Sequence, residues 1–134
     1  MDFLSEAWLA VRLRLGRADQ WLPDMNVRIQ HVVREAPDGA EVRYYDEVVG
    51  GRLVDSGLGE LSDPDVVITN LWADELAVLR GDLDMFDVLL AGRVEVDGDH
   101  GRLFLMVPTL ISAEFAKFSR ALVADLPVSG RAAH

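Results

Sequence analysis

Apolar and polar positions recur along this chain with two different periods, and each period predicts a kind of element. Near the amino end, apolar residues recur at helical spacing and predict a helix over residues 3–15, which we expect Gly16 to end. Residues 26–34 and 41–49 instead alternate with a period of two and predict a pair of antiparallel strands. The Pro-Asp-Gly segment at 37–39 lies between them and is typical of a turn, because proline presets φ and glycine accepts positive φ.

Two further strands and a series of short elements follow. A weaker strand is predicted at 52–56, and the nearly all-apolar run at 65–69 predicts a strand covered on both faces. Two amphipathic runs then predict short helices that end at Gly81 and Gly92. The alternating residues that come next predict an edge strand that ends at Gly98.

The stretch from 101 to 125 has the longest helical stripe of apolar residues in the chain. We expect Pro108 to kink or break it, and Ser112 to cap its second half. The stripe consists of Phe104, Val107, Ile111, Phe115, Phe118 and Leu122.

Composition and charge exclude several classes of function. The length of 134 residues predicts one domain over 1–126 and a flexible tail at 127–134. The formal net charge is −10, which argues against a nucleic-acid partner and against docking on anionic membranes. No run is apolar for long enough to predict stable membrane insertion, and the lack of cysteine fits a cytoplasmic protein. No cofactor or metal motif is present, so we expect neither group.

The stretch between Thr69 and Gly98 resembles the sterol carrier protein 2 family. Thr69 ends a predicted strand, and Gly81, Gly92 and Gly98 follow at the spacing at which that family closes two helices and a strand. The segment GDLD from Gly81 is similar to the family's Gly-x-Leu-Asn/Asp, and GRVEVDGD from Gly92 to its Gly-x-hydrophobic-x-hydrophobic-x-Gly-Asn/Asp. The order of elements on both sides also matches.

The resemblance implies an α/β (α+β) sandwich, in which helices cover one face of a five-stranded mixed sheet. It also implies an apolar tunnel between the layers that binds and transports a fatty acyl chain, a sterol or a related lipid. A stripe at helical spacing equally fits a plain core, so both interpretations stay open. The residues expected to line the tunnel are Trp72, Leu76, Met85, Phe86, Leu89, Leu90, Phe104, Val107, Ile111, Phe115 and Phe118.

His31, Tyr44 and Asp46 are polar residues on a strand face that is otherwise apolar. A turn centred near residue 38 would pair His31 with Tyr44 and place Asp46 diagonally on the same face. Because buried polar groups need partners, the three residues could satisfy one another, orient the polar head of a ligand, or poise His31 as a general base.

Three functions therefore stay open. The first is a carrier for a hydrophobic small molecule. The second is a small enzyme or accessory subunit that acts on a polyketide- or steroid-like substrate in the same pocket, with His31 as base. The third is an interaction module without a cavity, which contacts a partner enzyme or a second copy in a homodimer.

Overall fold

A computed structural model describes residues 2–18, 20–110 and 112–124. The helices are α1 (Glu6–Arg17), α2 (Trp72–Arg80), α3 (Met85–Leu90), α4 (His100–Leu110) and α5 (Ala113–Val123). The strands are β1 (Val27–Arg34), β2 (Val42–Val49), β3 (Arg52–Leu58), β4 (Val66–Leu71) and β5 (Glu95–Gly98). Each element that the sequence pattern predicts is present, with its bounds moved by a few residues. The expected tail at 127–134 lies outside the described residues.

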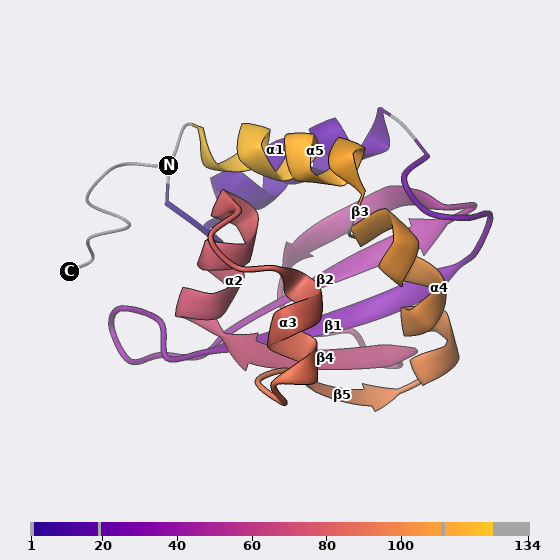
Figure 1. Ribbon diagram of the computed structural model, residues 1–134. Coiled ribbons are helices and arrows are strands. Elements are labelled where there is room, and N and C mark those ends of the chain that lie inside the picture. Colours follow the sequence, from indigo (N-terminus) through magenta and orange to yellow (C-terminus); the bar gives the residue numbers. More distant parts are fainter. Residues whose placement is uncertain (1, 19, 111, 125–134) are drawn as a thin grey trace.

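The strands form one mixed sheet in the order β3-β2-β1-β4-β5 (Figure 1). The first three strands are an antiparallel meander, β4 runs parallel to β1, and β5 pairs antiparallel with β4 at the edge. His31 lies opposite Tyr44, and Asp46 lies opposite Ile29, two pairs further along and therefore on the same face. The predicted register and the predicted five-stranded mixed sheet are both confirmed.

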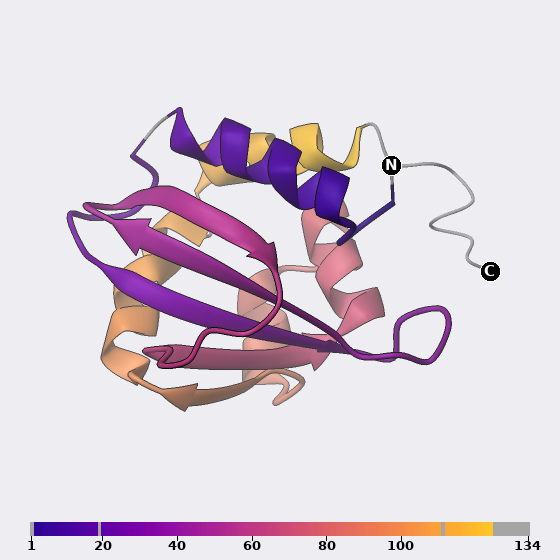
Figure 2. The same ribbon diagram turned by 180° about the vertical axis from the view of Figure 1, so that it is seen from behind.

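The described helices gather on one face of this sheet. Figure 2 shows the strands in front, with α2, α3 and α4 behind them and α1 and α5 along the top. The sandwich with helices on one face is therefore confirmed. The expectation that β4 is covered on both faces is wrong: its outward residues Val67 and Thr69 are only half-buried, because no described helix crosses that side.

Gly16 does not end the first helix, because α1 continues to Arg17. The glycine lies instead where α1 packs against β3. A Cβ atom at this position would lie 2.8 Å from Cδ2 of Leu53, a distance shorter than van der Waals contact. This glycine therefore marks a close approach between the helix layer and the sheet.

The last helical stretch is divided, but not at its proline. Pro108 lies inside α4, and the new helix begins after Ser112, whose hydroxyl accepts a hydrogen bond from the Phe115 backbone N–H at 3.1 Å. The predicted capping role of Ser112 is confirmed. Because the two helices have separate axes, the single apolar stripe expected over the whole stretch does not exist.

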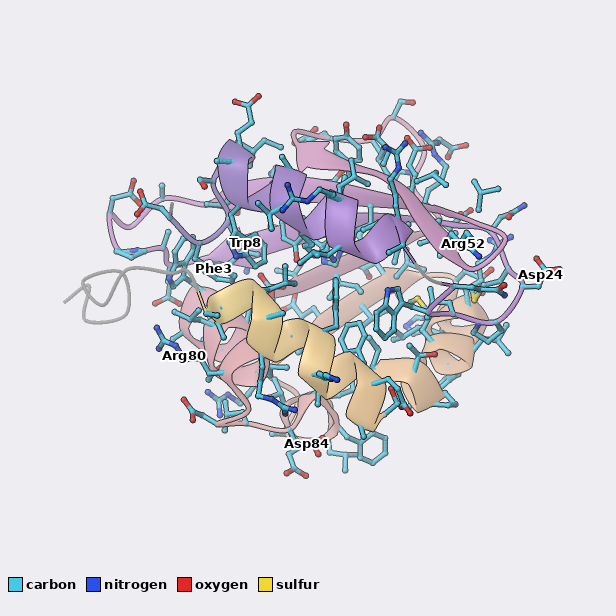
Figure 3. All side chains as sticks on the ribbon, turned by 90° about the horizontal axis from the view of Figure 1, so that it is seen from above. Phe3, Trp8, Asp24, Arg52, Arg80 and Asp84 are labelled. Atoms are coloured by element: carbon cyan, nitrogen blue, oxygen red, sulfur yellow. The ribbon has the colours of Figure 1, made fainter. Side chains whose placement is uncertain are left out.

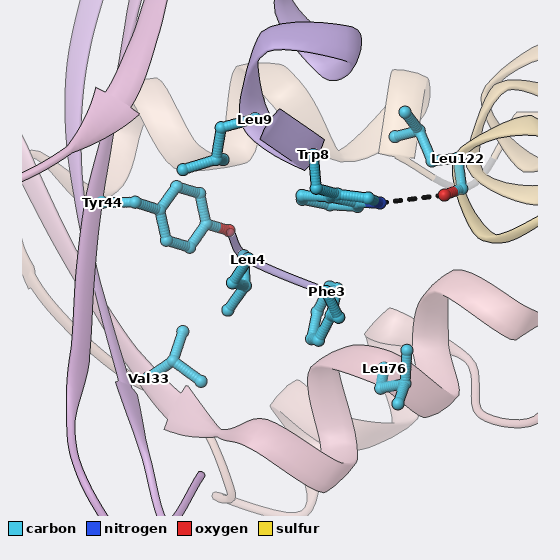
Figure 4. Packing of buried hydrophobic residues seen from close by; sticks show 8 residues of the cluster. All are labelled: Phe3, Leu4, Trp8, Leu9, Val33, Tyr44, Leu76 and Leu122. Atoms are coloured by element: carbon cyan, nitrogen blue, oxygen red, sulfur yellow. Dashed lines mark hydrogen bonds between the residues drawn. The ribbon is translucent and has the colours of Figure 1, made fainter. Parts of the chain in front are cut away.

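Two clusters of buried apolar residues fill the space between the layers. One joins α1, α2 and α5 to the sheet and includes Phe3, Trp8 and Leu76 (Figure 4). In it, the indole N–H of Trp8 donates to the backbone carbonyl of Leu122 at 2.9 Å. The other joins α4 to the opposite end of the sheet and consists of Val27, Ile29, Val48, Val66, Leu103 and Met106.

Two glycines of the family-like pattern provide a matched test of the fold. Gly81 and Gly98 both have positive φ, of 83° and 102°, but only Gly98 is crowded: a Cβ there would lie 2.3 Å from the Asp65 carbonyl oxygen. Both substitutions place an alanine at positive φ, but only Gly98→Ala also creates a steric clash. Gly98→Ala should therefore lower the free energy of unfolding by about 1–3 kcal/mol more than Gly81→Ala. Urea unfolding of both variants measures the difference. Equal losses would contradict the close packing of β5 on β4.

Candidate functional site: an apolar cavity between the layers

A cavity of about 210 Å³ lies between the sheet and the helices. Figure 3 shows α1 and α5 side by side over the sheet, which lies beneath them in that view. Residues of both buried clusters contribute to the wall, together with side chains from α3. The apolar part of the wall consists of Trp8, Trp21, Leu22, Ile29, Val48, Leu53, Ile68, Val78, Leu79, Met85, Phe86, Leu89, Val94, Val96, Leu103, Met106, Val107, Leu110, Phe115, Phe118 and Leu122.

The structure brings only part of the predicted set to this wall. Six of the expected residues line the cavity, namely Met85, Phe86, Leu89, Val107, Phe115 and Phe118. Trp72 and Leu76 belong to the first buried cluster instead, where the Trp72 ring meets Phe3 edge-on at 4.9 Å. Leu90 and Phe104 point away from the cavity and are 71% and 66% exposed. Ile111 lies outside the described residues.

The different place of Phe104 follows from the division between α4 and α5. Once α4 ends at Leu110, its inward face is set by its own contacts with the sheet. That face carries Leu103, Met106, Val107 and Leu110, at spacings of three and four residues. Phe104 is next to this face but outside it, whereas Met106, at the flank of the expected stripe, is 3% exposed.

The polar end of the cavity is built around Asp46, which is 3% exposed. Its carboxylate accepts a bidentate pair of hydrogen bonds from the Arg12 guanidinium, one of them at 2.9 Å. It also accepts from the Ser56 hydroxyl at 2.9 Å, and its second oxygen lies 2.8 Å from Nε2 of His31. Burial opposes ionisation of this carboxyl, but the charges and hydrogen bonds of Arg12 and His31 outweigh burial and hold the pKa of Asp46 below its usual range.

Tyr44 links this cluster to α2. Its ring stacks on His31 with the centroids 4.2 Å apart and the planes 4° from parallel. Its hydroxyl donates to Oε1 of Glu75 at 2.8 Å. Burial and the neighbouring Glu75 carboxylate raise the pKa of Tyr44 well above its usual value, so the hydroxyl keeps its proton and acts as a donor. His31 and Asp46 thus satisfy each other, whereas the Tyr44 hydroxyl is satisfied by Glu75 and its ring packs on His31. A satisfied polar network is one of the roles expected for them.

Three polar groups on the cavity wall have buried atoms without a hydrogen-bond partner among the described residues. They are Oδ1 of Asn70, Oε2 of Glu75 and Nε1 of Trp21. Native structures rarely leave such atoms unpaired, so each is a place where a ligand or water can bind. The sequence pattern does not single them out: Glu75 lies in the first turn of α2, where an acidic residue is common, and Asn70 and Trp21 are not among the residues that carry the family resemblance.

A second pocket of about 230 Å³ adjoins the cavity between α2, α4 and α5. It is more polar, and Asp84, Ser112 and Arg120 contribute to its wall. The residues that line both spaces are Val78, Leu79, Met85, Leu110, Phe115 and Ser119. These six residues form the wall that the two spaces share.

The described residues hold no group of three or more His, Cys, Asp or Glu side chains arranged to bind a metal ion. None of the described helices is long and apolar enough to cross a membrane.

The described chain is thus an α+β sandwich with an apolar cavity between its layers, and solved structures share the fold of this sandwich. The protein TT1886 from Thermus thermophilus matches with a TM-score of 0.76 and 20% identity, over 97% of this chain and 94% of that one. A crystal structure of sterol carrier protein 2 matches with a TM-score of 0.72 and 19% identity, over 89% and 98%. Palmitated SCP2L2 from Aedes aegypti matches with a TM-score of 0.64 and 22% identity, over 81% and 96%.

These identities are low, and what they show is the fold. No protein-family model matches the sequence, and no curated protein matches it either. The chain has the fold of sterol carrier protein 2, as the resemblance between Thr69 and Gly98 implied.

The buried Asp46 cluster gives a pH-dependent prediction. Asp46→Asn leaves the Arg12 charge buried without its counter-ion, so it should cost about 3–5 kcal/mol of unfolding free energy at pH 7. Because the folded pKa of Asp46 is lowered, its contribution is present above the unfolded value of about 4 and is lost as pH falls below it. Urea unfolding at pH 7 and pH 3 should therefore show a smaller acid-induced loss in Asp46→Asn than in the unsubstituted protein.

Asp63→Asn is the matched control, because this aspartate is exposed and its side chain makes no ion pair within the described residues. It should change stability at either pH by less than about 0.5 kcal/mol. An Asp46→Asn variant that behaves like this control would show that the cluster contributes nothing to folding.

Proposed function

We propose that this protein binds a hydrophobic small molecule, such as a fatty acyl chain, a sterol or a related lipid, in the cavity between sheet and helices and carries it unchanged. The observation that carries the proposal is the cavity itself, whose wall is mainly apolar and is formed by residues from the sheet and several helices. The fold shared with sterol carrier protein 2 and with palmitated SCP2L2 supports it.

Burial of methylene groups would drive such binding. Each CH₂ removed from water stabilises the complex by about 0.8 kcal/mol, so a chain of about ten contributes about 8 kcal/mol. Association costs about 4–15 kcal/mol, which is of the same size. Apolar burial alone therefore gives a modest affinity. Hydrogen bonds at the polar end of the cavity can then determine which ligands bind more tightly.

The size of the cavity bears on how a long ligand would fit. Its volume of about 210 Å³ is below the about 300–1,000 Å³ that is usual for ligand sites. We infer that a longer ligand also occupies the adjoining pocket once side chains of the shared wall move. Met85 belongs to that wall and, as an unbranched side chain, adapts easily to a new shape.

Binding is favoured over the enzymatic alternative. His31 and Asp46 do form an imidazole–carboxylate pair at the cavity, which is the arrangement that a general base needs. However, Arg12 and Ser56 also hold Asp46, and the pair is accounted for as part of a buried network. The interaction module without a cavity is disfavoured by the cavity. One ligand-binding domain over residues 1–126, a cytoplasmic location, and a homodimer or partner enzyme stay predictions from the sequence.

Two positions on α4 provide a matched test of binding in the cavity. Val107 lines the cavity, whereas Phe104 on the same helix is 66% exposed and does not. Val107→Trp should fill the cavity and weaken binding of Nile red, a neutral apolar fluorescent probe, by about tenfold or more, since about two lost CH₂ contacts already account for this much. Phe104→Trp should leave the affinity within about twofold. Fluorescence titration measures both, and circular dichroism checks that each variant is folded.

Equal probe affinity in the two variants, or no Nile red binding by the unsubstituted protein, would contradict the proposal. Mass spectrometry under native conditions adds an independent measurement. We expect it to find a co-purified apolar molecule on the unsubstituted protein and less of it on Val107→Trp.

A further inference from the structure

We propose that the cavity selects amphiphiles whose polar end donates hydrogen bonds, such as an alcohol or an amine, and discriminates against carboxylic acids. Glu75 on α2 is the residue that would decide this, and Asn70 on β4 offers a second polar group to the ligand. The inference rests on the proposed function, since it concerns the polar end of a ligand whose apolar body lies in the same cavity.

Glu75 presents a carboxylate to the cavity with one oxygen free. Its Oε1 accepts from the Tyr44 hydroxyl at 2.8 Å, while its Oε2 is buried and has no partner among the described residues. Tyr44 cannot serve a ligand as a donor, because its proton is already directed at Glu75. The free atom at this end of the cavity is therefore a charged acceptor.

Asn70 adds a second polar group, whose amide oxygen is unpartnered within the described chain. Because an amide both donates and accepts, Asn70 can bind the polar end of any of these ligands, and the choice among them depends on Glu75. Asn70 is 8% exposed, and its amide oxygen is buried without a hydrogen bond. Asn70 lies two residues after Ile68 on β4, so its side chain is on the same face of the sheet, and both residues line the cavity. A buried amide pointing into an apolar cavity indicates a site for a polar group of the ligand.

The basic side chains that line the described cavity wall, Arg12 and His31, are both already directed at Asp46. Arg12 is the only Arg or Lys among the described lining residues. Its guanidinium already donates twice to Asp46 and once to the Ser56 hydroxyl, the last at 3.1 Å. Glu75 itself has no ion-pair partner within the described residues. A ligand carboxylate would therefore meet an uncompensated like charge, whereas an ammonium or hydroxyl group would satisfy it.

Competition between ligands that differ only in the polar end tests this selection. Decylamine, 1-decanol and decanoic acid share one apolar body, and each is used to displace Nile red from the full chain at pH 7. Because hydrogen bonds to a charged group are strong, we expect the amine and the alcohol to displace the probe at concentrations at least about tenfold lower than the acid.

Two substitutions that each remove one negative charge separate a local effect from the overall acidity. Glu75→Gln neutralises the cavity carboxylate, whereas Asp87→Asn neutralises an exposed residue on α3. Glu75→Gln should reduce the disadvantage of the acid by about tenfold and weaken the amine more than the alcohol. Asp87→Asn should leave the ratios of the three ligands as they are in the unsubstituted protein.

The outcomes separate this inference from the proposed function. If Nile red binds but decanoic acid competes as well as the alcohol, or if Asp87→Asn changes the ratios as much as Glu75→Gln, the selection is wrong and the carrier function stands. If neither Nile red nor any decyl compound binds, both are wrong. If the amine and the alcohol compete better than the acid, and only Glu75→Gln removes this difference, Glu75 is the residue that determines specificity.

Discussion

The structure depends on one buried negative charge, that of Asp46. Its carboxylate on β2 is held by Arg12 from α1, His31 from β1 and Ser56 from β3. A buried carboxylate is tolerated only when all its partners are in place, so docking of α1 and correct pairing of three strands depend on one another. At the polar end of the cavity, the charge of Asp46 is balanced by Arg12. The unpaired oxygen of Glu75 is, by contrast, a polar atom there that is open to a ligand.

Most of the fold could be predicted from the sequence, because period-two alternation and turn residues are local signals that determine which face of a strand is buried. His31 and Tyr44 were placed opposite each other by this argument alone. The sequence predicts that glycines end helices, but this is the role of only some of them. Gly81 ends a helix as expected, with φ of 83°, whereas Gly16 is needed for contact with Leu53, a residue 37 positions away that no local pattern reveals.

The cavity was harder to predict than the fold, since its wall depends on how short helices are rotated when they dock. Periodicity gave the apolar set on α3 to α5, but it could not tell that Met106 turns inward and Phe104 outward. The polar residues were missed for a different reason. Arg12 and Glu75 occupy helix positions where charged residues are usually solvated, and only the packed structure shows that they face the cavity.

The hydrogen bond between Trp8 and the carbonyl of Leu122 has a consequence for how the protein is made. It joins the first described helix to the last, 114 residues apart in the chain. During synthesis, the described strands leave the ribosome before α5 does. Until α5 packs against them, the helix-facing side of the sheet stays partly uncovered and the Trp8 indole lacks its hydrogen-bond partner. The cavity is complete only once α5 has packed in place, so a nascent chain exposes its apolar interior until that helix has been synthesised.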